Sequence, residues 1–157
     1  MAQTRKTARQ KLAANHGLPK VVRIPPRMRR QYGNGKMVVP SPRLVDSVIR
    51  KVEKGKLITP RMIRDWLARD FRADFCCPMT TGIFLRLSAE AAEEDSASGK
   101  TRITPWWRVV KDDGTLMEKF PNAPDEQEIR LQAEGFVIEK VKGKRRVRDF
   151  QRFLHEN

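Results

Sequence analysis

The chain has 157 residues, with 33 Lys and Arg against 19 Asp and Glu, and a formal net charge of +14. This length suits a single domain, and no apolar run is long enough for a membrane span or a secretory signal. The only cysteines, Cys76 and Cys77, are neighbours, a spacing that fits neither a disulfide framework nor a zinc site. We therefore expect a cytoplasmic protein in a reducing setting, without metal, cofactor or membrane contact.

Positive charge is concentrated in two segments. Residues 1–45 lack Asp and Glu and contain eleven cations: Arg5, Lys6, Arg9, Lys11, Lys20, Arg23, Arg27, Arg29, Arg30, Lys36 and Arg43. Residues 140–148 lack acids and contain six: Lys140, Lys142, Lys144, Arg145, Arg146 and Arg148. Such patches favour nucleic acid, because each neutralised phosphate releases a counterion. A solvated tail is the alternative for the first segment, which has no amphipathic stripe for a membrane surface.

Residues 1–40 are expected to form a basic, flexible arm, because four prolines and three glycines interrupt any periodic pattern. Order is expected to begin at Ser41, a good helix N-cap that is followed by Pro42. Apolar residues at helical spacing then continue until Gly55, which is expected to end this first helix.

A second helix is predicted over residues 60–71, because Thr59 and Pro60 repeat the signal of a cap followed by proline. Trp66 falls on the apolar face of this helix and is expected in the core. Residues 56–58 before it form a short apolar run that is compatible with a strand.

A third helix is predicted over residues 80–96, after a turn. Its inward arc is expected to hold Ile83, Phe84, Leu87 and Ala91. Its outward arc is expected to hold Gly82, Leu85, Arg86, Ala89 and Glu93. The acidic rear of the helix would repel phosphate and would suit a basic protein partner. Its N-terminal half is therefore expected to contact nucleic acid, with the positive end of the helix dipole towards the anion.

The C-terminal third predicts a helix over residues 124–133, ended by Gly135. Two strands follow, residues 136–141 and 145–150, around a Lys-Gly turn, and then a short terminal helix. A helix, turn and helix followed by a basic hairpin are typical of a winged helix-turn-helix domain. We expect an α/β (α+β), mainly helical fold with a domain over residues 41–135 and a wing segment over residues 136–157.

The sequence shows no composed catalytic group. His16 lies in the predicted arm, His155 lies near the end of the chain, and no pair of carboxylates stands out. Cys76 and Cys77 precede a helix N-terminus, where thiol pKa values fall, so a reactive thiolate is one interpretation. Burial beside Phe75 is the other, and it is the commoner outcome for cysteine.

Two of the three tryptophans, Trp106 and Trp107, are consecutive. In a strand they would face opposite sides, so that one is buried and the other stacks on a base, an interaction worth roughly 1–3 kcal/mol. In a turn both could border a pocket. Burial of both in the core is the third interpretation.

Residues 55–135 resemble the DNA-binding domain of the alkylguanine-DNA alkyltransferases, and more closely the alkyltransferase-like proteins. GKLITPRMI (55–63) resembles the segment that leads into the first helix of that domain. PWWRVVKDDGTL (105–116) is similar to the proline-cysteine-histidine-arginine-valine signature, and RLQAEG (130–135) to the leucine-rich helix that ends in glutamate-glycine. The resemblance implies a domain that flips a damaged guanine into a pocket, where an activated thiolate accepts the alkyl group.

The chain departs from the family at the reactive residues. Trp106 stands at the position of the nucleophilic cysteine, and Trp107 at that of the histidine. Alkyltransferase-like proteins also carry tryptophan at the first position and bind the lesion without repairing it. Arg108 matches the family, as does Glu134, the last member of the activating network.

Two further departures concern base flipping. Pro60 stands where the family has a tyrosine. The intercalating arginine aligns near Gly82, and Arg86 follows one turn later. The chain therefore lacks, at these two positions, the residues that the family uses for base flipping.

We therefore predict a monomeric, non-enzymatic, nucleoid-associated protein that binds double-stranded DNA, including alkylated DNA, and flags lesions for a repair-pathway protein. The residues expected in the groove are Thr80, Thr81, Gly82 and Arg86. Those around the alkyl pocket are Pro105, Trp106, Trp107, Arg108 and Glu134, of which Arg108 is also expected to bind DNA. The second cationic segment, with the arm, is expected to hold phosphates. The alternatives are a general architectural DNA- or RNA-binding protein and an active alkyltransferase that uses Cys76 or Cys77.

Overall fold

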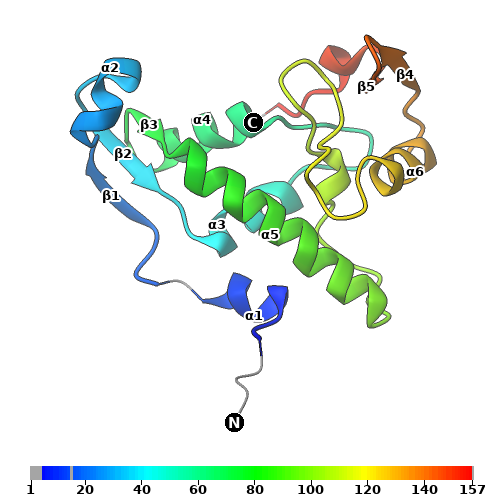
Figure 1. The fold of residues 1–157 in the computed structure, drawn as a ribbon, viewed down its shortest axis with the longest axis horizontal. Coiled ribbons are helices and arrows are strands. Elements are labelled where there is room, and N and C mark those ends of the chain that lie inside the picture. Colours follow the sequence, from blue (N-terminus) through cyan, green and yellow to red (C-terminus); the bar gives the residue numbers. More distant parts are fainter. Residues whose placement is uncertain (1–4, 15, 157) are drawn as a thin grey trace.

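A computed structural model describes residues 5–14 and 16–156. The expectations for the first four residues of the arm, for residue 15 and for residue 157 lie outside the described residues. The fold is α+β and mainly helical, as the sequence predicts. Its longest element is the 20-residue helix α5, which crosses the molecule (Figure 1). None of the described helices is long and apolar enough to cross a membrane.

Three helices form the centre of the fold: α3 (Pro42–Arg50), α4 (Pro60–Asp70) and α5 (Pro78–Ala97). Two predicted caps are confirmed. The hydroxyl of Ser41 accepts a hydrogen bond from the backbone N–H of Leu44 at 3.1 Å, and Thr59 accepts one from Met62 at 3.2 Å. Caps act through neighbouring residues only, so they are readable from sequence. The first helix ends five residues before Gly55, which lies in the following turn with a φ of 85°.

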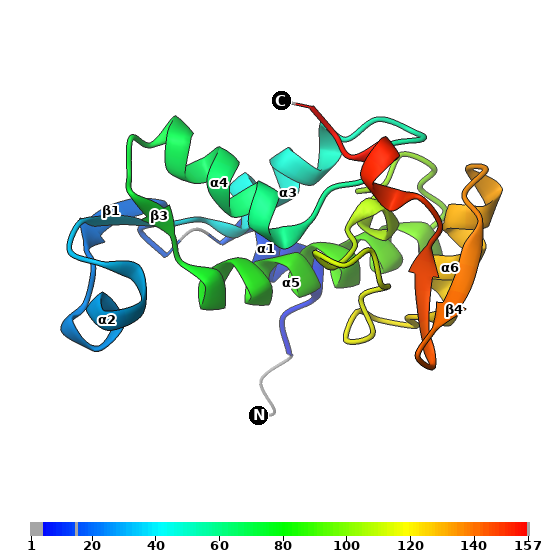
Figure 2. The same ribbon diagram turned by 90° about the horizontal axis from the view of Figure 1, so that it is seen from above.

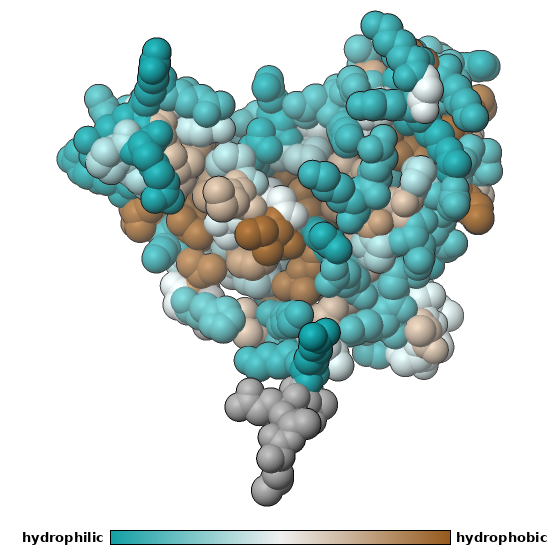
Figure 3. All heavy atoms as spheres, viewed as in Figure 1, coloured by the Kyte–Doolittle hydropathy of each residue, from teal (hydrophilic) through white to brown (hydrophobic). Residues whose placement is uncertain are grey.

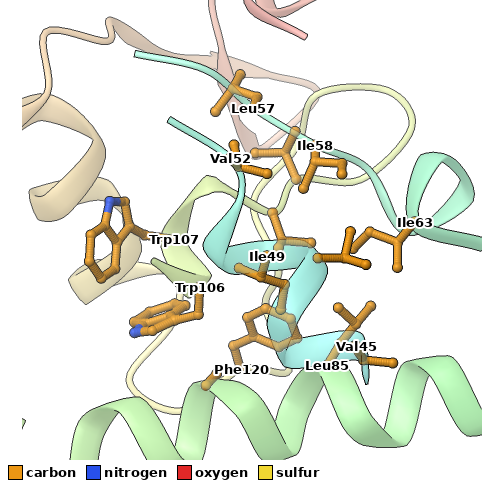
Figure 4. Close-up of a cluster of buried hydrophobic side chains, with 14 of the residues drawn as sticks. Val45, Ile49, Val52, Leu57, Ile58, Ile63, Leu85, Trp106, Trp107 and Phe120 are labelled. Carbon is orange, nitrogen blue, oxygen red and sulfur yellow. The ribbon is translucent and has the colours of Figure 1, made fainter. Parts of the chain in front are cut away.

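The helices and the segment after α5 enclose one main core (Figure 4). Its fully buried side chains include Val45, Ile49, Ile63, Leu67 and Trp106. Trp66 is 7% exposed, so its predicted core position is confirmed. The short apolar run before α4 forms two isolated parallel bridges, Leu57 with Leu154 and Ile58 with Val109.

The segment predicted as a flexible arm carries regular structure: α1 (Ala8–Ala13), β1 (Lys20–Arg23), the 3₁₀ helix η1 (Pro26–Met28), α2 (Arg29–Tyr32) and β2 (Lys36–Val39). β2 pairs antiparallel with β1 and parallel with β3 (Phe75–Cys76), which gives a three-stranded sheet. The prediction failed because it relied on local periodicity, which the prolines and glycines interrupt. The pairing of β2 with β3 instead joins residues far apart in sequence.

α1 binds the acidic end of α5. The backbone N–H groups of Ala8 and Arg9 donate to the carboxylate of Glu94, at 2.8 and 3.0 Å, and the guanidinium of Arg9 pairs with Asp95. Leu12 packs beside them in a small apolar cluster. The acidic rear of the third helix, expected to suit a basic partner, thus has one within its own chain.

The predicted faces of α5 are partly wrong. Leu85 and Ala89, expected outside, are 1% and 0% exposed, whereas Ile83, expected inside, is 59% exposed. The reason is that α5 is covered on two sides, by the main core and by α1. A single hydrophobic arc therefore does not identify the buried face. The helix also begins at Pro78, earlier than the predicted caps Thr80 and Thr81.

The C-terminal elements are the 3₁₀ helix η2 (Trp106–Arg108), α6 (Asp125–Ala133), β4 (Ile138–Val141), β5 (Lys144–Val147) and the 3₁₀ helix η3 (Phe150–Phe153). The predicted hairpin is confirmed, with shorter strands than expected. Its two turn residues, Lys142 and Gly143, have positive φ values of 52° and 78°, which match the right-handed twist of paired strands. Figure 2 shows the hairpin at the opposite end of the molecule from α2 and the β1–β2–β3 sheet.

Candidate nucleic-acid interface

Both consecutive tryptophans are buried, on the single turn of η2. Trp106 is 0% exposed and Trp107 is 9% exposed. Their rings meet edge to face, with centroids 6.2 Å apart, and Trp106 meets Phe120 in the same way at 5.9 Å. Figure 4 shows the pair at the edge of the main core. The interpretation that both are buried therefore applies, and neither ring presents a face for stacking on a base.

Each indole N–H is bound by a different glutamate. Trp106 donates to Glu93 of α5 at 2.9 Å, and Trp107 donates to Glu134, just after α6, at 2.8 Å. The tryptophan pair thus connects η2 to the two helices on either side of it. Buried indoles need such acceptors, because an unsatisfied buried N–H is costly.

Arg108 and Glu134, which the sequence analysis places around the pocket, form a partly buried ion pair. Three hydrogen bonds of 2.8–3.2 Å join the guanidinium and the carboxylate, and Arg108 also donates to the carbonyl of Val52 at 2.6 Å. Burial acts to raise the pKa of Glu134, but the hydrogen bonds from Arg108 and Trp107 outweigh it and hold that pKa below its ordinary value. Glu134 is therefore a charged structural anchor for the tryptophan turn.

Gln127 is a buried residue of this region that the sequence analysis missed. Its amide nitrogen donates to the carbonyls of Trp107 and Val109 at 3.1 and 2.7 Å. Its amide oxygen accepts from the backbone of Met117 at 2.8 Å. A signal existed, because Gln127 precedes the buried Leu131 by one turn on the same face of α6.

The predicted groove-facing residues of α5 divide into two groups. Gly82 and Arg86 are exposed, and Arg86 pairs with Glu90 one turn later at 3.1 Å. Thr81 is fully buried and donates to the carbonyl of Cys77 at 2.8 Å. Thr80 is half-buried and donates to the Cys77 sulfur at 3.2 Å. Thr81 therefore has no access to a groove, because it closes the first turn of the helix instead.

The hairpin cations also divide into two groups. Arg145 pairs with Asp125 and Glu128 at 2.7 and 3.1 Å. Arg146 and Arg148 both pair with Glu139, at 2.7 and 3.3 Å. Within the part of the chain that the structure describes, three hairpin side chains are exposed and have no ion pair: Lys140, Lys142 and Lys144. Three of the six cations in residues 140–148 are thus paired with carboxylates, and all of these carboxylates lie outside that segment.

The cysteines are buried at the start of α5. Cys76 is 1% exposed and Cys77 is 8% exposed. Burial raises the pKa of the Cys76 thiol, an effect larger than the opposing hydrogen bond with Thr81. A thiol with a raised pKa is a poor nucleophile. Among the described residues, no group of three His, Cys, Asp or Glu side chains is placed to bind a metal ion.

Similarity to solved structures shows that the chain has an alkyltransferase-like fold. No family model matches the chain, and no curated protein matches it. One solved structure with a similar fold is that of S. pombe Atl1 in complex with damaged DNA containing O6-carboxymethylguanine (TM-score 0.52, 18% identity). Another is S. pombe ATL in complex with DNA (TM-score 0.54, 19% identity). Each likeness covers 74% of this chain and 94% of the other. The alkyltransferase-like fold expected from the sequence is confirmed.

Proposed function

We propose that the chain is a non-enzymatic DNA-binding protein that recognises alkylated or otherwise distorted duplex DNA and flags it for a repair-pathway protein. The observation that carries the proposal is Trp106, which replaces the nucleophilic cysteine of the resembled signature and is fully buried with its indole bound to Glu93. An indole in that position cannot accept an alkyl group as a thiolate does. The buried Cys76 and Cys77 do not offer a substitute nucleophile.

Two features support DNA as the partner. The formal net charge of +14 favours a polyanion, and the solved structures of similar fold are complexes with DNA, one of them damaged. The exposed face of α5 at Gly82 and Arg86 is the part of the helix-turn-helix that is free to meet a duplex. The wing lysines and the cations of β1, α2 and β2 supply phosphate contacts on either side.

The test of lesion recognition is the affinity for two duplexes that differ by one O6-alkylguanine, measured by fluorescence anisotropy at one fixed salt concentration. We expect the lesion duplex to bind about tenfold more tightly, because a damaged base costs less to unpair. Equal affinity would remove lesion recognition and leave a general architectural DNA-binding protein. The intact mass after incubation with the lesion duplex is expected to stay unchanged, and a gain of one alkyl group on a cysteine would contradict the non-enzymatic role.

A matched pair of variants tests whether α5 carries the interface. Gly82 is exposed, and a Cβ there would meet no protein atom within 4 Å, so Gly82→Glu adds a negative charge without steric conflict. Gln132→Glu adds the same charge to an exposed position of α6. We expect Gly82→Glu to weaken binding about tenfold, because like charges across an interface repel. Equal effects of the two variants would exclude the α5 face.

A further inference from the structure

Two large apolar side chains stand exposed on the N-terminal half of α5. Met79 is 73% exposed and Ile83 is 59% exposed. They lie four residues apart, so they are neighbours on one face of the helix. Figure 3 shows an apolar patch over this half of α5, surrounded by hydrophilic side chains. Neither residue belongs to the main core, and exposed apolar patches of this kind mark interaction sites.

Met79 and Ile83 form a ridge on this face of α5, and the helix backbone beside the ridge is uncovered. Gly82 lies between Met79 and Ile83 in sequence, is exposed, and has no protein atom within 4 Å of where a Cβ would be. A flat partner can therefore approach the helix backbone closely at Gly82, while Ile83 and Met79 project towards it. A ridge of this kind suits insertion between two flat surfaces better than packing against a broad one.

A groove of about 440 Å³ runs beside the ridge, between α1, the start of α3 and α5. Its apolar lining comes from Pro42, Phe84 and Leu87, next to Ile83 itself. Its charged and polar lining comes from Lys11, His16, Arg86 and Glu90. Glu90 is engaged by Arg86, which leaves Lys11 as a cation that is exposed and has no ion pair among the described residues. Apolar walls with a cation at the edge fit the sugars and phosphates of a nucleic-acid strand.

We propose that Ile83, with Met79 beside it, inserts between adjacent base pairs of duplex DNA while the neighbouring groove receives the backbone of one strand. This inference rests on the proposed function and names the residues that sense a weakened base step. Apolar side chains inserted at a base step unstack and kink the duplex, and a step next to a damaged or mismatched pair is cheaper to open. The alternative occupant, a protein, fits less well, because stable protein interfaces need a larger surface than this ridge and the surrounding charge is positive.

The first test places 2-aminopurine, whose fluorescence rises on unstacking, at one step of a short duplex. Binding of the native chain is expected to raise the fluorescence. Ile83→Ala is expected to abolish most of the rise and to weaken affinity about tenfold, because the burial of most of the side chain is lost. Met79→Ala is expected to have a smaller effect in the same direction. Ile129→Ala, a change at an Ile of α6 that is 60% exposed, is the matched control and should change neither quantity.

The outcomes separate this inference from the proposed function. Binding by the native chain without a fluorescence rise, or a rise that Ile83→Ala leaves intact, would overturn the insertion and would leave DNA binding in place. An unchanged affinity of Ile83→Ala would also overturn the insertion and would favour a protein as the partner of the ridge. Failure of the native chain to bind any duplex would overturn the proposed function itself.

The groove is tested by salt dependence. Lys11→Gln should reduce the slope of log K against log salt by about one, the value for one lost phosphate contact, without reducing the fluorescence rise at saturation. Lys54→Gln, at an exposed lysine in the turn between α3 and α4, is the control for loss of one charge. Equal slopes for Lys11→Gln and the native chain would overturn the assignment of the groove to the DNA backbone.

Discussion

At the scale of single residues, the tryptophan pair has a structural role, because both rings are buried and both indole N–H groups are hydrogen-bonded. The resembled signature places a nucleophile and its activating histidine where this chain has Trp106 and Trp107. Their indoles bind Glu93 and Glu134 instead, so the glutamate that would complete an activating network holds a turn in place. Trp106 is therefore part of the main core and has no exposed surface.

Replacing Trp106 is therefore expected to destabilise the fold. Trp106→Ala should lower the free energy of unfolding by about 3–5 kcal/mol, because a large cavity replaces a fully buried ring. Urea denaturation followed by circular dichroism measures the change. Ile129→Ala, at an exposed position of α6, should have an effect near zero and serves as the control. A loss below about 1 kcal/mol for Trp106→Ala would contradict the tight packing of η2 against α5.

Glu134 makes a stability contribution that depends on pH. Its folded pKa lies below the ordinary value, so its contribution is complete above the unfolded pKa and is lost as pH falls through the folded pKa. Glu134→Gln should lower the free energy of unfolding by about 2 kcal/mol at neutral pH, because the half-buried guanidinium of Arg108 loses its partner. The difference between native chain and variant should shrink as pH falls below about 4. Denaturant titrations over this range measure it, and a difference that does not change with pH would contradict the ion pair's role.

At the scale of elements, the sequence predicts what neighbouring residues decide. The caps at Ser41 and Thr59 and the Lys-Gly turn of the hairpin act over a few residues, and the structure has all three. The sheet of β1, β2 and β3 depends on pairing between residues that lie about 40 positions apart in the sequence, such as Val38 and Cys76. A local sequence pattern does not predict such a pairing. The buried face of α5 was predicted wrongly for the same reason, because α1 packs against Leu87 and Ala91 while the main core packs against Leu85 and Ala89 on another side of the helix.

The hairpin is expected to contact phosphates through its lysines rather than its arginines. Lys142→Gln combined with Lys144→Gln should reduce the slope of log K against log salt by about two, since each lost phosphate contact removes roughly 0.9. Arg145→Gln is the contrasting variant, because the guanidinium is already paired with Asp125 and Glu128. It should change the slope less. An equal change for Arg145→Gln would mean that DNA displaces these carboxylates.

At the scale of the whole molecule, two groups of exposed cations without ion pairs lie at opposite ends. Exposed cations on β1, η1, α2 and β2 have no ion pair among the described residues: Lys20, Arg23, Arg27, Arg29, Arg30 and Lys36. The hairpin lysines lie at the opposite end (Figure 2). The composition gives the net charge of the chain, but it does not predict which cations form ion pairs with carboxylates and which do not. The reason is that Asp125, Glu128 and Glu139 reach the hairpin arginines through the fold.

If one duplex contacts both ends across the α5 face, the two sets of cations should act independently. Arg27→Gln with Arg30→Gln removes two exposed charges at one end, and Lys142→Gln with Lys144→Gln removes two at the other. Each pair should lower the salt slope by about two, and the fourfold variant by about four, because distant sites are additive. The free energy of unfolding should stay close to that of the native chain, since all four side chains are exposed.

The length of the duplex provides a second measurement of the same arrangement. A duplex long enough to reach both ends should show the full additive change, whereas one too short to reach the second end should lose the effect of one pair of substitutions. An unchanged slope for Arg27→Gln with Arg30→Gln on the long duplex would mean that the N-terminal sheet faces away from DNA. The duplex would then be held by α5 and the hairpin alone, and the charge of residues 20–36 would need a different partner.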